Sequence, residues 1–152
     1  LGSRLTPSAV IQQAVELAWQ QHNWLLQGEY MAQQVEVANP ELQQDNQYQG
    51  YYIQLSYLLG QIKYNYKTSR FTRPSLRQQP HSVEFIARHS HMDVFDNNTG
   101  SKADSHILGM NYYLGKNMKL MLHYQQAKIT RPTSSFLQKP SAVNFRIQYL
   151  FR

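Results

Sequence analysis

The stretch AVNFRIQYLF, residues 142–151, alternates apolar and polar side chains along almost its whole length. One face would carry Val143, Phe145, Ile147, Tyr149 and Phe151, and the other Ala142, Asn144, Arg146, Gln148 and Leu150. A period of two is typical of a β-strand, in which successive side chains point to opposite faces. A helix would place residues i and i+2 about 200° apart and would form no apolar stripe. The stretch therefore predicts a strand with one apolar face and one largely polar face.

The same alternation recurs in six further segments. These are residues 10–21, 24–37, 48–59, 82–94, 104–114 and 118–129. The first segment could also be helical, but its tight connection to the second favours a strand. Each segment is roughly ten to fourteen residues long, whereas strands of globular proteins usually have about five or six. A tilted strand that crosses a bilayer needs about nine to eleven residues. The lengths therefore favour membrane-spanning strands.

The predicted connections alternate between short and long. Residues 21–23 and 115–117 form tight turns, 38–47, 95–103 and 130–141 form longer polar loops, and 60–81 is an exceptional connector of 22 residues. Short turns at one end and long loops at the other are typical of outer-membrane barrels. An aromatic girdle is predicted at the short-turn end, from Trp19, Trp24, Tyr112, Tyr149 and Phe151. A soluble β-sandwich, which also alternates, remains the alternative architecture.

The composition excludes several classes of protein. A length of 152 residues indicates one domain, and the absence of cysteine excludes a disulfide framework, a thiolate metal site and a cysteine nucleophile. No run of 18 apolar residues is present, so no transmembrane helix is expected. The chain opens at Leu1-Gly2-Ser3 without a methionine, and we expect a fragment or a cleaved product.

The net charge of +6 is unevenly distributed. Residues 1–62 contain one cation and five acids, whereas residues 63–152 contain 14 cations and four acids. The densest basic cluster consists of Lys63, Lys67, Arg70, Arg73 and Arg77. Such a cluster attracts anions, although a solvated basic loop is an equally good interpretation. With Tyr64, Tyr66 and Phe71 as stacking surfaces, it also allows an alternative function, a soluble basic β-protein that binds nucleic acid or another polyanion.

Several segments resemble the phosphate-selective porin O and P family. WLLQGEYM, residues 24–31, is similar to the W-x-L-Q-G-E-Y hairpin of that family. Further similar strands are GYYIQLSYLLG at 50–60, VEFIARHSHMD at 83–93, LGMNYYL at 108–114, KLMLHY at 119–124 and FRIQYLF at 145–151. Each motif alone is weak, but together they occur in the family's order over residues 12–151.

The resemblance implies an all-β fold, an antiparallel up-and-down transmembrane barrel of sixteen strands. Residues 1–152 would supply about seven C-terminal strands of that single domain. It further implies a bacterial outer-membrane porin, a water-filled channel for phosphate-like anions that is neither an enzyme nor dependent on a cofactor. The expected partners are outer-membrane lipid, small inorganic anions, the remaining strands of the barrel and two further copies in a homotrimer, but no nucleic acid.

Alternation assigns Arg88, Lys119 and Arg146 to the lumen of such a barrel. The basic cluster of Lys63, Lys67, Arg70, Arg73 and Arg77 would form a cationic mouth. These cations would attract anions and replace part of their hydration shell. Plain solvation or structural pairing is the competing interpretation for each of them, with Glu29 and Glu84 as carboxylates on the same face as Arg88 and Arg146.

Catalytic and metal-binding motifs are weak. His89 and His91 share one strand face, Asp93 is assigned to the other, and a third metal ligand is not evident. The chain contains no G-x-S-x-G, H-E-x-x-H or P-loop motif. The sequence therefore predicts neither a catalytic site nor a metal site.

Overall fold

The computed structural model describes residues 7–37, 46–59, 65–67, 70–72, 81–94, 100–115, 117–131 and 134–151. These residues form strands and turns, and none of them forms a helix long and apolar enough to cross a membrane. The long strands are β1 (Pro7–Gln21), β2 (Trp24–Val37), β3 (Asn46–Leu59), β6 (His81–Asp93), β7 (Lys102–Leu114), β8 (Met118–Arg131) and β10 (Ser141–Tyr149). Three short strands are β4 (Asn65–Lys67), β5 (Arg70–Thr72) and β9 (Ser134–Gln138).

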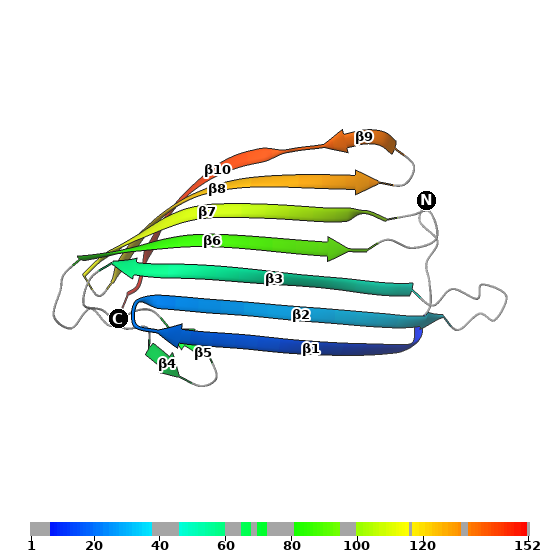
Figure 1. Ribbon diagram of the computed structural model, residues 1–152, viewed down its shortest axis with the longest axis horizontal. Helices are drawn as coiled ribbons and strands as arrows, with labels where there is room; N and C mark the ends of the chain where they lie inside the picture. Colours follow the sequence, from blue (N-terminus) through cyan, green and yellow to red (C-terminus); the bar gives the residue numbers. More distant parts are fainter. Residues whose placement is uncertain are drawn as a thin grey trace.

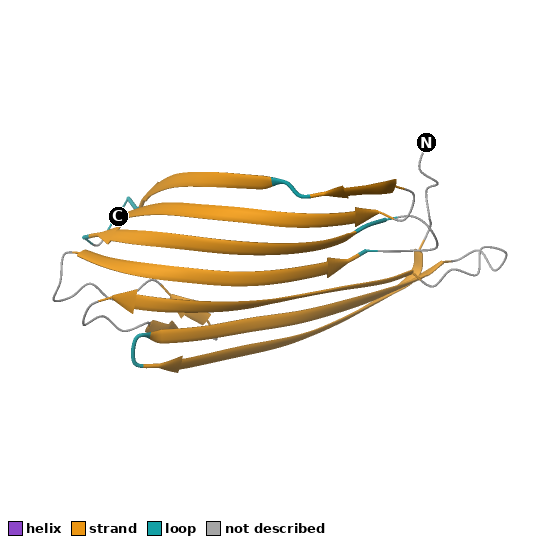
Figure 2. Ribbon diagram, turned by 45° about the horizontal axis from the view of Figure 1, so that its top comes forward, coloured by secondary structure: helices purple, strands orange, loops and turns teal. Residues whose placement is uncertain are grey.

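The long strands form one antiparallel sheet in the order β1-β2-β3-β6-β7-β8-β10, in which each strand pairs with the next long strand along the chain (Figure 1). β9 pairs with β8, and β4 pairs with β5 in a separate ribbon. Turned by 45°, the sheet is a single curved layer with β1 at one edge and β10 at the other (Figure 2). The predicted all-β, up-and-down topology is confirmed, and the sheet of this chain is not closed.

The tight turns gather at one end of the sheet (Figure 1). His22 and Asn23 connect β1 to β2, with His22 at a positive φ of 53°. At the turn after β7, Gly115 takes a φ of 52°, which glycine adopts without a Cβ clash. Residues from neighbouring parts of the sheet also form hydrogen bonds with these turns. Leu58 donates its backbone N–H to the carbonyl of Asn23 at 2.9 Å. Leu150 does the same to Asn117, also at 2.9 Å.

Among the described residues, the buried side chains, including the apolar Leu25, Leu58 and Tyr113, all belong to one face of the sheet. Large apolar side chains of the other face are exposed, among them Val143 at 70%, Leu17 and Leu108 at 63%. Within the part of the chain that the structure describes, the buried polar side chains are Ser56, Ser82, Glu84 and Asn111, and all belong to the opposite face. A β-sandwich would pack its apolar rows against a second layer. Within the described residues these rows contact no such layer, so the architecture is not a sandwich.

The position of the apolar residues along the strand changes steadily from one strand to the next. One row of cross-strand partners comprises Trp19, Leu26, Leu55, Ala87, Leu108, Tyr124 and Val143. On β1 the apolar residues continue from this row toward the long connections, through Leu17 and Val15. On β10 they continue toward the tight turns, through Phe145, Ile147 and Tyr149. In membrane barrels the strands tilt by about 35–45°. Residues at the same depth in the membrane then lie in different cross-strand rows, and a band of such residues runs obliquely across the sheet. We call these exposed apolar residues the apolar band.

Leu122 and Gln125 lie on β8 but on opposite faces, which allows a matched test of the apolar band. Leu122→Arg is expected to weaken folding into phosphatidylcholine vesicles by about 2–4 kcal/mol, because it places a charge in hydrocarbon. Gln125→Arg is expected to have little effect, because its side chain meets water. Urea titration of vesicle-folded protein measures both. Equal effects of the two substitutions would contradict the assignment of the faces.

Candidate functional site

The polar face of the sheet carries the candidate site. Its central row runs across all seven strands and comprises Ala18, Gln27, Gln54, Arg88, Ile107, Gln125 and Ala142. The next row toward the long connections contains Glu16, Glu29, Tyr52, Ser90, Ser105 and Ala127. Amide, hydroxyl and carboxylate groups at this density favour a surface in contact with water. The face can therefore line an aqueous space.

Arg88 is the only cation of the central row. Its guanidinium carbon lies 3.9 Å from the centroid of the Tyr52 ring, and its Nε donates to Ser90 Oγ at 3.1 Å. Neither ion pair seen between described residues, His91–Asp104 or Asp93–Lys102, includes Arg88. Stacking on a tyrosine restricts the guanidinium without neutralising its charge. Arg88 is therefore a fixed, charged donor in the middle of the polar face.

The other predicted lumen cations lie on the same face but closer to the tight turns. Lys119 is the cross-strand partner of Tyr113, and its Nζ lies 5.0 Å from that ring. Arg146 is exposed opposite Met121 and makes no ion pair within the described part of the chain. The placement agrees with the alternation, while the role of these cations in ion selection stays a prediction.

The predicted cationic mouth is only partly described. Lys67 and Arg70 are cross-strand partners in the β4–β5 ribbon, which lies near the tight-turn end of the sheet (Figure 1). Lys63, Arg73 and Arg77 lie outside the described residues. The role of this cluster therefore remains a prediction.

A buried polar network occupies the polar face near the tight turns. Glu84, which is 6% exposed, accepts hydrogen bonds from Asn111 Nδ2 at 2.8 Å and from the Tyr113 hydroxyl at 2.6 Å. Asn111 Oδ1 lies 3.1 Å from His123 Nε2, and since this oxygen only accepts, His123 is the donor. Alternation predicted the face of Glu84 but not these partners, because they depend on the pairing register of β6, β7 and β8.

Gly109 makes room for this network. It is the cross-strand partner of His123, and a Cβ at Gly109 would lie 2.4 Å from His123 Cδ2. The imidazole therefore lies over the glycine backbone, where it reaches Asn111. A side chain at position 109 would push the ring away from its partner.

Four of the five predicted girdle residues lie in long strands, and all four are on the apolar face. Trp19, Trp24, Tyr112 and Tyr149 occupy four successive rows as the sheet runs from β1 to β10, each row closer to the tight turns. Phe151 follows, with its ring 4.8 Å from that of Tyr149. This shift toward the tight turns follows the oblique apolar band. In tilted strands, the five aromatics therefore lie at one depth in the membrane. Their role as a girdle stays a prediction.

A second set of aromatic residues, Tyr30, Tyr51 and Tyr124, lies at the end of the apolar band nearer the long connections, and the sequence analysis did not predict it.

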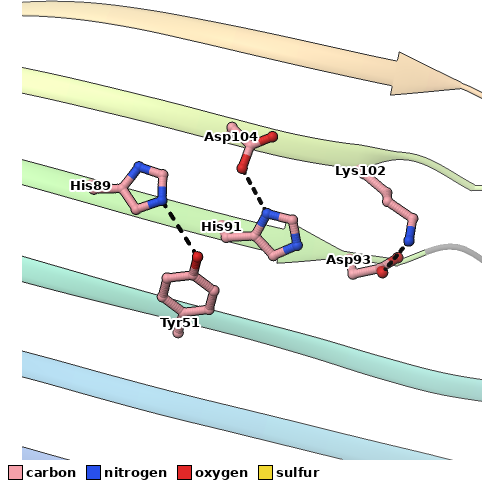
Figure 3. A network of polar contacts seen from close by, with 6 residues as sticks. All are labelled: Tyr51, His89, His91, Asp93, Lys102 and Asp104. Carbon is pink, nitrogen blue, oxygen red and sulfur yellow. Dashed lines mark hydrogen bonds and ion pairs between the residues drawn. The ribbon is translucent and has the colours of Figure 1, made fainter.

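The histidine segment of β6 differs from the expectation in one respect. The assignment of Asp93 to the face opposite His89 and His91 is wrong, since the ladder continues without a bulge and places all three on the apolar face. His91 Nδ1 lies 2.7 Å from Asp104, and Asp93 lies 2.7 Å from Lys102 Nζ (Figure 3). The described residues contain no group of three His, Cys, Asp or Glu side chains that could hold a metal ion.

Tyr113→Phe tests whether the Glu84 network stabilises the sheet. Loss of a buried hydrogen bond to a carboxylate is expected to lower the free energy of unfolding by about 1.5–3 kcal/mol. Tyr112→Phe is the matched control, because Tyr112 is the next residue but lies on the apolar face. The control should change stability by less than about 0.5 kcal/mol. Urea unfolding of detergent-folded protein measures both, and equal stabilities of the two variants would exclude a stabilising network.

Comparison with known proteins agrees with this geometry. The family model described as phosphate-selective porin O and P matches residues 3–151. Porin O of Pseudomonas aeruginosa is 27% identical over 134 residues, which cover 80% of this chain and 30% of that protein. The two matches point to the bacterial outer membrane and to a class of channels rather than enzymes. Since the family model covers nearly the whole chain, the chain belongs to the phosphate-selective porin O and P family.

Proposed function

We propose that this chain forms part of the wall of a water-filled channel that conducts small anions, with phosphate-like ions as the natural class. The observation that carries the proposal is the contrast between the two faces of one sheet. One face exposes the apolar band, and the other carries a central row whose polar members are Gln27, Gln54, Arg88 and Gln125. A wall between lipid and water requires this arrangement, whereas a soluble polyanion-binding protein has no use for exposed apolar rows.

The free edges of β1 and β10 indicate how the wall is completed. Backbone N–H and C=O groups left unpaired in hydrocarbon cost several kcal/mol each, so both edges need partner strands. The chain spans 30% of the length of Porin O, which leaves room for such strands in the longer relative. We therefore propose that residues 1–152 act as the C-terminal segment of a barrel of about sixteen strands, assembled as a homotrimer.

Anion selection in this proposal depends first on Arg88, which is positioned without belonging to either ion pair His91–Asp104 or Asp93–Lys102. Arg88 keeps its charge while Tyr52 and Ser90 fix its orientation. Guanidinium groups bind phosphate oxygens through parallel charge-assisted hydrogen bonds, and they replace part of the water around the ion. Lys119 and Arg146 add positive charge nearer the tight turns. Passage requires that none of these sites binds the ion too tightly to release it.

Arg88→Glu tests the selectivity directly in the complete barrel. The wild-type channel in a planar bilayer is expected to give an anion-selective reversal potential in a potassium chloride gradient. A change of local potential by about one kT lowers the anion concentration about threefold and raises the cation concentration by the same factor, so Arg88→Glu should lower the anion-to-cation permeability ratio about sevenfold.

Lys128→Glu is the matched control, since it makes the same charge change on the apolar face, outside the pore. It should leave the reversal potential unchanged. A cation-selective wild-type channel would contradict the proposed function, as would a protein that stays soluble without detergent. An unchanged ratio in Arg88→Glu would remove Arg88 from the anion pathway.

A further inference from the structure

The apolar face carries a polar network on β3, β6 and β7 that the proposed channel does not use. His91 is paired with Asp104, and Asp93 with Lys102 (Figure 3). The Tyr51 hydroxyl lies 3.5 Å from His89 Nε2, and the rings of His89 and His106 are 4.7 Å apart. His89 Nδ1 is buried and has no hydrogen-bond partner within the described chain. We call these side chains, together with the exposed Lys128 beside Asp104, the rim network.

The rim network begins where the apolar band ends. Toward the long connections, Ala87 and Leu108 are the last apolar cross-strand partners on β6 and β7. The next pair on the same face is His89 and His106. Ionisable side chains in the hydrocarbon of a barrel's outer face cost about 2–4 kcal/mol at mid-depth and about 0–1 kcal/mol at the interfaces. The network therefore marks the level of the lipid head groups, on the side of the long connections.

An apolar hollow of about 390 Å³ lies directly below the rim network. Its lining includes Leu55, Ala87 and Leu108, and His89 and His106 form its polar border. The hollow exists because Ala87 is a small residue between two leucines in the same cross-strand row. Hydrocarbon chains fill such a hollow favourably, since contact is lost wherever a gap remains.

A second cavity, of about 420 Å³, borders the network on the side of β1, β2 and β3. Its lining includes the amides Gln13, Gln34, Gln47 and Gln49, the phenol of Tyr30, and the Asp93 and Lys102 pair. Amides, a phenol and an ion pair provide donors and acceptors for sugar hydroxyls. A polar cavity and an apolar hollow thus meet at the rim network.

We propose that this surface binds one lipid of the outer leaflet, an anionic glycolipid whose head group is a phosphorylated saccharide. An acyl chain fills the hollow over Ala87, the phosphate contacts Lys128 and the rim-network histidines, and the sugar occupies the glutamine-lined cavity. The rows follow one another along the strands toward the long connections, from Ala87 and Leu108, through Asp104 and Lys128, to Gln49, Asp93 and Lys102. This sequence of rows matches the order of tail, phosphate and sugar, and it favours a lipid over a second copy of the chain. The proposal rests on the proposed function only in that the apolar face contacts the membrane.

Native mass spectrometry of the complete barrel in detergent, titrated with lipid A, tests the acyl-chain contact. Wild-type protein is expected to retain one tightly bound lipid A per chain. Ala87→Trp fills the hollow and should weaken retention at least about tenfold. Val143→Trp introduces the same ring in the same row on β10, away from the hollow, and should retain the lipid as the wild type does.

Two further variants test the head-group contact. Lys128→Gln should weaken retention of lipid A at least about threefold, but not retention of dephosphorylated lipid A, because it removes a charge-assisted contact to phosphate. Arg131→Gln removes a cation on the same strand but from the polar face, and it should have no effect on either lipid. Equal binding of the two lipids by wild-type protein would overturn the head-group assignment.

Unchanged lipid retention in Ala87→Trp would overturn the proposed site. If this variant instead dissociated into single chains with its lipid retained, the hollow would be an interface between copies, and the proposal would also fail. Conductance of Ala87→Trp, Val143→Trp and Lys128→Gln is recorded separately and should equal that of the wild type, because these three positions lie on the apolar face, outside the pore. A wild-type protein that binds lipid A but does not conduct would count against the proposed function and not against the lipid site.

Discussion

The structure depends on the inability of hydrocarbon to hydrogen-bond the backbone. Any chain that crosses a bilayer as strands must pair every N–H and C=O with a neighbouring strand. This requirement explains the long, nearly unbroken ladders, such as the one between β6 and β7, which pairs His81 with Leu114 at one end and Asp93 with Lys102 at the other. It also explains why the exposed apolar rows are no liability here, since lipid replaces the second layer that a soluble sheet would need.

The oblique course of the apolar band connects this constraint with function. It indicates strands that are tilted with respect to the membrane, and tilt is what allows a sheet to curve into a barrel. Curvature then separates the two faces into a lipid side and a water side. Arg88 and the Glu84 network lie on the polar face, while the rim network lies on the apolar face where the apolar band ends. In the proposed channel, a single period of two along each strand therefore places the anion pathway and the lipid contact on opposite surfaces of one wall.

Alternation predicted the seven long strands and their faces because exposure to lipid on one side leaves a simple signal in every strand. It missed β4, β5 and β9, since three to five residues are too few to show a period. It could not show that Glu84 meets Asn111 and Tyr113, because such contacts depend on register, which no single strand encodes. The rim network was missed for the same reason, and Asp93 was also assigned to the wrong face. The role of the basic cluster at 63–77 remains a prediction.

Site-directed spin labelling tests the separation of lipid and water most directly. The chain has no cysteine, so single cysteines along β8 at positions 120–125 each introduce one label. In the membrane-embedded barrel, we predict that oxygen accessibility peaks at Leu120, Leu122 and Tyr124, and that accessibility to a water-soluble nickel chelate peaks at Met121, His123 and Gln125. Accessibilities that rise and fall together, or that show no period of two, would contradict the account.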